Sequence, residues 1–525
     1  MTRIPIQDIS LGDFSAELDQ RLHEYFLEET PSYKSAISFD DNRYILLGRT
    51  GSGKSAILSH IRERFGSNKD YLCVLIKPDE HYLDIIVRTN QFNYLKKAGD
   101  IRGLLYKLVW HYTIIASILE EKYGDAGPRK KMQLLMGNDL KAYNFLEKLG
   151  KVSRENLTFT DRIFQVIDII SVDIKFVKLK NKEENKQIDQ ELLELVKDVQ
   201  VFRGNYLKDI LEGQKIYLLF DDLDVDWNPK DEDQQMLLRA LFEVSRDYVY
   251  DDNIKPLIAI RSNILDGLNL PQREKYESNI RLITWTKPLL KEMLVLRLQK
   301  YKMIDSPSGL NDLFHKKVSE DIGDIGNVMY QDPLDYIIEK TLYRPRDVLA
   351  FCKYSISGAA QRGAYRIEME HVLVAESIYT EQRLKALSDE WRYIYPHLDL
   401  LTKLLIKIAT RNRGTTNIKA VEIKEILESS REVILTASNE DHIYSILHWI
   451  QSYYQADEES PEEIIKLLYK LGIIGCRDDL GDFSFSHNVS PMPYISKRTE
   501  FTFHPMFRNI KVANFLLDDE DDSPW

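Results

Sequence analysis

The fold is decided by eight residues, Gly48-Arg49-Thr50-Gly51-Ser52-Gly53-Lys54-Ser55, which spell a glycine-rich phosphate-binding loop. The apolar run Tyr44-Ile45-Leu46-Leu47 precedes this loop and has the length of a buried strand. Apolar residues at helical spacing follow it: Ala56, Ile57, Ile61 and Phe65. Gly66 stands where a helix that begins near Lys54 would end. Strand, glycine turn and helix therefore follow one another in the order that a P-loop requires.

This loop predicts a binding site for a nucleoside triphosphate with Mg²⁺. Glycines let backbone N–H groups close around phosphates at a helix N-terminus, where the helix dipole favours negative charge. Lys54 would reach the β- and γ-phosphates, and the Ser55 hydroxyl would bind Mg²⁺. The absence of an Asn-Lys-x-Asp guanine motif favours ATP over GTP. The predicted nucleotide-binding residues of the loop are Gly48, Thr50, Gly51, Ser52, Gly53, Lys54, Ser55 and Ala56.

A second strand supplies the carboxylates that hydrolysis requires. Ile216-Tyr217-Leu218-Leu219-Phe220 is apolar without alternation, as expected for a parallel strand that is covered on both faces, and Asp221-Asp222-Leu223-Asp224 follows it. The acidic residues should emerge at the carboxyl edge of the sheet, beside the P-loop. We expect Asp221 to bind Mg²⁺ and Asp222 to orient or deprotonate the attacking water. An acidic turn without function is the alternative.

A third strand, Lys255–Ile260, ends in Arg261-Ser262-Asn263. Arg261 is a candidate sensor of the γ-phosphate because its side chain always carries charge, and Asn263 is the second choice. A structural ion pair between Arg261 and the acidic strand edge is the alternative.

These motifs, followed by Tyr343-Arg344-Pro345-Arg346-Asp347, resemble the STAND and KAP branches of P-loop ATPases, which are relatives of AAA+ proteins. More narrowly, the chain resembles a stand-alone bacterial P-loop ATPase family that is often found in antiviral defence loci. The resemblance implies a nucleotide-controlled switch that forms a homo-oligomer and controls an effector, a nuclease or toxin from the same locus. KAP proteins differ by carrying transmembrane helices between the two motifs.

The resemblance also implies two further contacts with the nucleotide. Arg344 or Arg346 would be a lid arginine that reaches the phosphates, although Pro345 also suits an ordinary helix start. His504, in Phe501-Thr502-Phe503-His504-Pro505, would contact ADP in a resting state. A histidine at a strand end more often makes local hydrogen bonds.

The predicted fold class is α/β: a P-loop NTPase with a parallel sheet flanked by helices, a large helical insertion, a helical lid and a C-terminal winged-helix-like domain. The predicted boundaries are 1–290 for the ATPase core with its insertion at about 82–213, 291–380 for the lid and 381–525 for the C-terminal domain. The last assignment depends on a helix that follows the cap Ser460, has Pro461 in its first turn and ends at Gly472, and on strands at 473–477 and 500–503.

Composition limits the compartment and the partners. Cys73, Cys352 and Cys476 are widely separated, as expected of thiols in a reducing cytoplasm. The longest apolar stretch, 104–119, is too short and too polar to span a bilayer, so we expect no membrane segment. A net charge of −12 argues against a protein that binds nucleic acid over its whole surface. It is compatible with a local basic patch that binds nucleic acid.

The sequence therefore supports three hypotheses. The first is an ATP-hydrolysing switch in antiviral defence. The second is a DNA-binding ATPase similar to origin-recognition proteins. The third is a scaffold that holds ATP with little turnover.

Overall fold

The computed structural model divides the chain into two compact units, which are described separately. We call Glu28–Arg49 with Lys54–Ile283 the sheet unit, and Met1–Leu27, Thr50–Gly53 and Thr284–Trp525 the helical unit. The structure describes residues 5–78, 102–123, 199–211, 213–223, 227–316, 332–413, 417–419, 462–477, 483–486 and 499–507, with the single residues 137, 140, 197, 422 and 481.

The sheet unit is built on five parallel strands in the order β2-β3-β4-β1-β5. Their bounds are Ile45–Gly48 (β1), Tyr71–Ile76 (β2), Lys215–Phe220 (β3), Ile254–Arg261 (β4) and Ile280–Leu282 (β5). All residues of β3 after Lys215 are buried, as the run of apolar residues without alternation predicts. The P-loop strand β1 lies between β4 and β5, and β4 separates it from the acidic strand β3.

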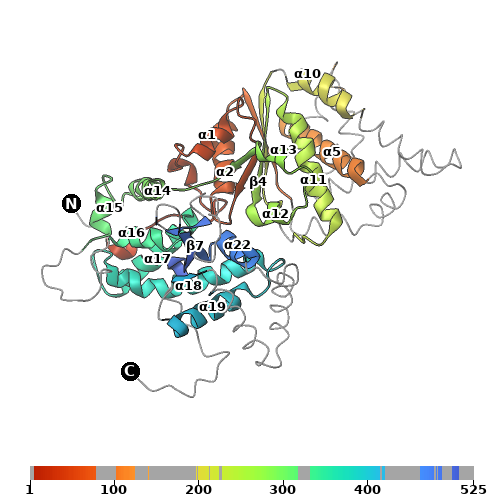
Figure 1. The fold of residues 1–525 in the computed structure, drawn as a ribbon. Coiled ribbons are helices and arrows are strands. Elements are labelled where there is room, and N and C mark those ends of the chain that lie inside the picture. The colour runs from red at the N-terminus through yellow and green to blue at the C-terminus, as the bar shows by residue number, and fades with distance from the viewer. Residues whose placement is uncertain are drawn as a thin grey trace. The chain divides into compact units, whose positions relative to one another are not determined.

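Helices cover both faces of this sheet (Figure 1). α1 (Pro31–Ile37) and α2 (Lys54–Phe65) lie on one face, and α5 (Arg102–Tyr123) and α11 (Glu232–Val249) lie on the other. Asp231 caps α11 by accepting hydrogen bonds from the N–H groups of Asp233 and Gln234. The other described elements are η4 (Phe202–Leu207), α10 (Lys208–Leu211), α12 (Ser262–Gly267) and α13 (Glu274–Glu277).

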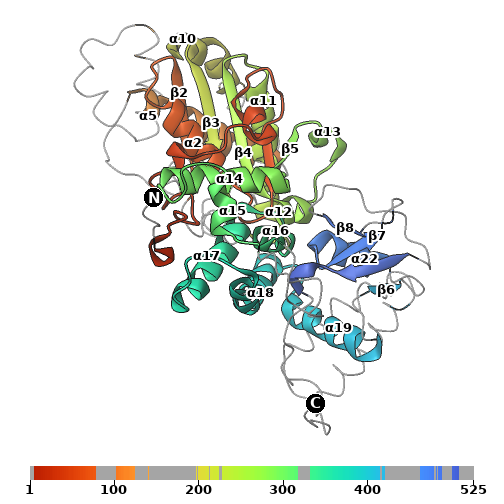
Figure 2. The ribbon, with the colours of Figure 1, turned by 90° about the vertical axis from the view of Figure 1, so that its left-hand side faces the viewer.

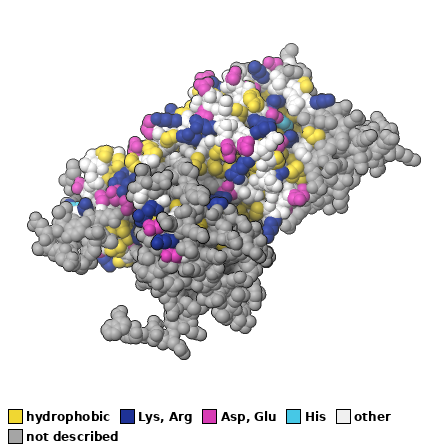
Figure 3. Space-filling view, in the orientation of Figure 1, with side chains coloured by type: hydrophobic (Ala, Val, Ile, Leu, Met, Phe, Trp, Pro, Cys, Tyr) yellow, Lys and Arg dark blue, Asp and Glu magenta, His cyan; other side chains and the backbone are white. Residues whose placement is uncertain are grey.

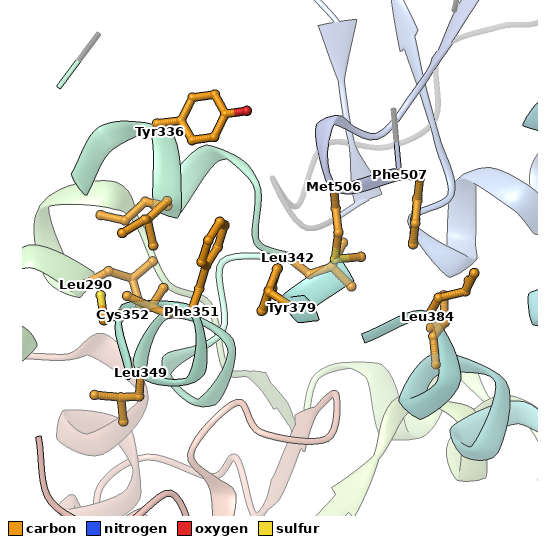
Figure 4. Packing of buried hydrophobic residues seen from close by; sticks show 14 of the residues in the cluster. Leu290, Tyr336, Leu342, Leu349, Phe351, Cys352, Tyr379, Leu384, Met506 and Phe507 are labelled. Atoms are coloured by element: carbon orange, nitrogen blue, oxygen red, sulfur yellow. The ribbon is translucent and has the colours of Figure 1, made fainter. Parts of the chain in front are cut away.

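The helical unit packs long helices around one apolar core. Phe351 on α17 and Tyr379 on α18 stack with ring centroids 4.4 Å apart, and Figure 4 shows Met506 and Phe507 from the C-terminal segment beside this layer. The helices of this unit are η1 (Ile6–Asp8), η2 (Leu22–Glu24), α14 (Lys287–Lys300), α15 (Gly309–Leu313), α16 (Pro333–Glu339), α17 (Pro345–Gln361), α18 (Met369–Trp391), α19 (Leu398–Arg413), α22 (Glu462–Leu471) and η7 (Pro505–Phe507).

A small antiparallel sheet completes the helical unit (Figure 2). Its strand order is β6-β9-β7-β8, with bounds Asn417–Lys419 (β6), Ile474–Arg477 (β7), Phe483–Ser484 (β8) and Glu500–Phe503 (β9). α22 leads directly into β7 through Gly472, whose φ of 78° suits the turn after a helix.

The predicted α/β fold class is confirmed: a parallel sheet carries the P-loop and helices flank it. Helices with a small sheet follow, and the winged-helix-like assignment of this part stays a prediction. The domain boundaries at 290 and 380 stay predictions, and most of the insertion at 82–213 lies outside the described residues. The short strands β5, β6 and β8 were not predicted. Among the described helices, none is long and apolar enough to cross a bilayer.

Candidate nucleotide-binding site

The sheet unit places the predicted motif residues at the carboxyl edge of its strands. Gly48, at the end of β1, pairs with Arg261, at the end of β4. On the other side of β4, strands β2 and β3 pair Ile76 with Phe220, so the residues that follow, Lys77 and Asp221, leave the sheet at the same level. Parallel pairing thus brings the ends of these strands to one edge.

Ser55 and Asp221, the two predicted Mg²⁺ ligands, are joined by a hydrogen bond between their side chains. Asp221 is only 7% exposed, and its Oδ1 also accepts a hydrogen bond of 3.1 Å from the N–H of Asp222. Burial and the neighbouring charge of Asp222 raise the pKa of Asp221 to about 6. A buried carboxylate whose charge is disfavoured next to a second carboxylate is suited to a divalent cation.

Asp222 is held differently. Its backbone adopts a φ of 51°, in the left-handed region that few residues other than glycine occupy, and its Oδ2 lies 2.6 Å from the ammonium nitrogen of Lys77. Both side chains are partly exposed, at 31% and 40%. The turn after β3 therefore directs two successive carboxylates to different partners.

Lys54 lies over the beginning of its own loop. Its ammonium nitrogen donates hydrogen bonds to the carbonyl oxygens of Gly48 at 3.0 Å and of Arg49 at 3.1 Å. The lysine thus remains within one turn of the backbone that would surround the phosphates.

The middle of the P-loop, Thr50–Gly53, belongs to the helical unit, whereas its chain neighbours Arg49 and Lys54 belong to the sheet unit. The Arg346 N–H donates to the carbonyl oxygen of Gly51 at 3.4 Å. A Cβ on Gly51, which has a φ of 79°, would lie 2.9 Å from the Cβ of Arg346, so only glycine permits this approach. Trp285 donates from its indole nitrogen to the carbonyl oxygen of Ser52 at 2.8 Å.

Arg344 and Glu390 bind the two sides of the Thr50 peptide group. The guanidinium of Arg344 donates to the Thr50 carbonyl oxygen at 2.9 Å, and the Thr50 N–H donates to Glu390 Oε1 at 3.2 Å. Arg344 also binds Asp347 at 2.8 Å, and Asp347 binds Arg383 at 2.6 Å. Of the two predicted lid arginines, one thus contacts the loop through its side chain and the other through its backbone.

His504 is buried in the small sheet of the helical unit. Its Nδ1 accepts a hydrogen bond from the N–H of Met506 at 3.1 Å, and its ring packs edge-on against Phe485 at 4.8 Å. These are the local contacts expected of a histidine at a strand end, and a contact with ADP stays a prediction.

The loop residues fit a bound polyphosphate. Thr50 Oγ1 and Ser52 Oγ are buried, and the described residues give neither oxygen a hydrogen-bond partner. Such hydroxyl groups can donate to phosphate oxygens, while Ser55 and Asp221 offer the hard oxygen ligands that Mg²⁺ prefers. Along the chain, groups that can bind phosphate are therefore followed by groups that can bind Mg²⁺, as expected of a nucleotide site.

Three residues of this region were not predicted: Lys77, Trp285 and Glu390. A signal existed for Lys77, because it directly follows an apolar strand and so reaches the same edge as Asp221. No local motif marks Glu390, which stands near the end of a long helix 340 positions after Thr50.

The fold is α/β, and Gly48, Lys54, Ser55 and Asp221 have the arrangement expected of a phosphate-binding P-loop with its acidic strand. One protein-family model matches part of the chain. Residues 288–388, which include most of α14 to α18, match a family model described as a FunZ-associated C-terminal helical domain.

The chain is also 21% identical over 512 residues to the "Putative transposon gamma-delta 80.3 kDa protein" of Escherichia coli K12. The match covers 94% of this chain and 66% of that protein, so the chain spans just under two thirds of its length.

Similar solved structures include two ORC proteins of Aeropyrum pernix. The Aeropyrum pernix ORC2 protein, in ADPNP–ADP complexes, is 12% identical with a TM-score of 0.38 and coverage of 93% of this chain and 94% of that one. The Aeropyrum pernix ORC1 protein in complex with DNA is 14% identical with a TM-score of 0.32, covering 95% and 91%. With TM-scores below 0.5, these structures define neither a ligand nor a partner for this chain, and the STAND, KAP and defence assignments stay predictions.

Proposed function

We propose that this chain binds Mg·ATP at the P-loop, hydrolyses it, and couples the nucleotide state to oligomerisation or to control of a partner protein. The contact between Ser55 and Asp221 carries the proposal, because a phosphate-binding loop and an acidic strand share one side-chain hydrogen bond. That contact joins residues which the sequence separates widely and which would both bind the metal of a bound nucleotide.

The residues divide the chemistry between them. Backbone N–H groups of the loop and Lys54 bind the phosphates. Ser55 and Asp221 hold Mg²⁺, which would neutralise the charge on the phosphates. Asp222 orients the attacking water and accepts its proton, so it must first exchange the ammonium of Lys77 for that water. Arg261, whose strand residue pairs with Gly48, reaches the terminal phosphate from the adjacent strand end.

The helical unit would report the nucleotide state. Arg344, Arg346 and Trp285 all bind backbone groups of Thr50–Gly53, so a change in the loop alters the contacts of α17 and of the segment before α14. His504 would stabilise the ADP-bound form through the small sheet. Antiviral defence is the setting that the family resemblance favours.

Two substitutions test the proposal. Lys54→Ala should abolish nucleotide binding, and Asp222→Asn should preserve binding while stopping steady-state phosphate release. Lys34→Ala, which removes an exposed lysine paired with Glu29 in the same unit, is the matched control and should change neither. Wild-type rates in both site variants would end the ATPase assignment, whereas binding without turnover in the wild type would favour the scaffold hypothesis.

The output is tested by native mass spectrometry of the chain with ADP and with a slowly hydrolysed ATP analogue. A larger particle with the analogue supports nucleotide-controlled oligomerisation, and one mass under both conditions contradicts it.

A DNA-engaging ATPase is the second candidate. The similarity to a transposon protein over 94% of the chain favours it. Figure 3 shows basic and acidic side chains interspersed over the described surface of one face, which is not the continuous basic stripe of a typical nucleic-acid site. A salt titration decides: a steep loss of DNA affinity with salt supports this candidate, and no binding at low salt removes it.

A further inference from the structure

A carboxylate of the helical unit accepts a hydrogen bond from a backbone amide of the phosphate-binding loop. Glu390, on α18, accepts a hydrogen bond of 3.2 Å from the Thr50 N–H, and its side chain is only 5% exposed. A hydrogen bond to an ionised acceptor is generally stronger than one between neutral groups. The loop therefore already holds an anion, and the protein itself supplies it.

The same side chain belongs to a group of charged residues around Asp347. Arg344 lies 3.5 Å from Glu390 and 2.8 Å from Asp347, and Asp347 lies 2.6 Å from Arg383. Arg346 and Glu17 interact electrostatically with the same group, so three arginines stand against three acids. Without the charge of Glu390 the group would be net positive beside Thr50, which would attract an anionic ligand.

We propose that Glu390 is a built-in competitor of the nucleotide, which holds the P-loop against α18 until phosphate binding displaces its carboxylate. A phosphate and a carboxylate cannot both approach the loop at this point without repulsion, because both are negative and little water screens them. The neighbouring carbonyl contacts of Arg344 and Trp285 are compatible with phosphate, since they engage the opposite, acceptor side of the loop. Glu390 therefore lowers nucleotide affinity and links binding to release of the loop from α18. This inference rests on the proposed nucleotide-binding function.

Glu390→Gln tests it, because glutamine keeps the size and an acceptor oxygen but removes the charge. The affinity for a slowly hydrolysed ATP analogue with Mg²⁺, measured by calorimetry on the full chain, should rise roughly tenfold. Glu381→Gln is the matched control. It removes the same charge from the same helix at an exposed residue paired with Lys403, and its affinity should stay within about twofold of wild type.

Hydrogen exchange of nucleotide-free protein supplies a readout that does not depend on nucleotide binding. Glu390→Ala should speed exchange of the Thr50 amide at least tenfold relative to wild type, and Glu381→Gln should leave it unchanged. An unchanged Thr50 exchange rate, or equal affinities of wild type and Glu390→Gln, overturns the inference while the nucleotide-binding function stands. Absence of binding in wild type, Glu390→Gln and Lys54→Ala alike overturns the proposed function itself.

Discussion

Asp221 in the sheet unit and Asp347 in the helical unit are both buried carboxylates, yet their surroundings are opposite. Asp347 is fully buried between Arg344 and Arg383; burial alone would raise its pKa, but the two guanidinium groups outweigh burial and hold the pKa below its usual value. Asp221 is 7% exposed beside Asp222, and burial together with that like charge raises its pKa to about 6.

The difference separates a structural charge from a site. The chain supplies the cations that Asp347 requires, so that carboxylate helps to hold α17 and α18 together. Asp221 is left in an environment that disfavours its charge and that a divalent ion would reverse. An acid whose pKa is strongly raised at a sheet edge beside a P-loop is a candidate functional group for this reason. An acid whose charge is neutralised by two arginines stabilises the structure instead.

Asp347→Ala breaks the comparison on the structural side and should have the largest effect. It leaves two buried arginines without their shared partner, so we expect the free energy of unfolding of the helical unit to fall by about 3–5 kcal/mol. Hydrogen exchange of peptides from α17 and α18 under increasing denaturant measures the loss.

Glu381→Ala is its control, because Glu381 is an exposed carboxylate whose pair with Lys403 should contribute less than about 1 kcal/mol. Equal losses in the two variants would mean that Asp347 is no more important than a surface acid.

Asp221→Asn tests the other side, and its effect on stability has the opposite sign. A raised carboxyl pKa means that the folded state binds the proton more tightly than the unfolded state, so stability falls as pH rises from about 4 to 6 and stays lower above. Removing the charge should therefore stabilise the sheet unit by about 3 kcal/mol at pH 7 in the presence of a chelator. It should also abolish Mg²⁺-dependent nucleotide binding.

The same variant at pH 4 is an internal control, because the wild-type carboxyl is then protonated and the stability gain should disappear. A variant that is less stable than wild type at pH 7 would show that Asp221 is already neutralised by the chain.

The central fold could be predicted because its elements carry strong local signals. β3 and β4 are apolar runs followed by polar residues, and α2 begins at the P-loop lysine and ends before a glycine. β5 was missed because it has only three residues, none of them buried, and therefore no run long enough to recognise.

The candidate site was partly predictable for the same reason. Ser55 and Asp221 stand at fixed places in motifs, and parallel pairing brings such places to one edge. The contacts of Thr50 with Glu390 and Arg344 could not be predicted, since they depend on the packing of α18 and α17 rather than on spacing.

His111, on α5 of the sheet unit, is a buried base that can be compared with the buried acids Asp221 and Asp347. Burial and the charges of Arg203 and Lys107 lower its pKa to about 3, and its Nε2 lies 3.9 Å from Asp247. The folded state therefore keeps His111 neutral, and stability is lost as pH falls below about 6.5, by roughly 2 kcal/mol at pH 5. With His111→Phe, the free energy of unfolding of the sheet unit should decrease less as the pH falls below about 6.5. His23→Phe, at an exposed position of the helical unit, should leave this pH dependence unchanged.

Lys77→Met should have the smallest effect on stability, because Lys77 and Asp222 form an ion pair in which both side chains are partly exposed. We expect the free energy of unfolding to change by less than about 1 kcal/mol, and the change to shrink in high salt. Its effect on turnover should be larger: without the ammonium, Asp222 is available to water, so phosphate release should rise several-fold if hydrolysis limits the rate. A variant that is as stable as wild type and slower would instead place Lys77 on the phosphates, and the pair with Asp222 would then be a resting contact of a catalytic lysine.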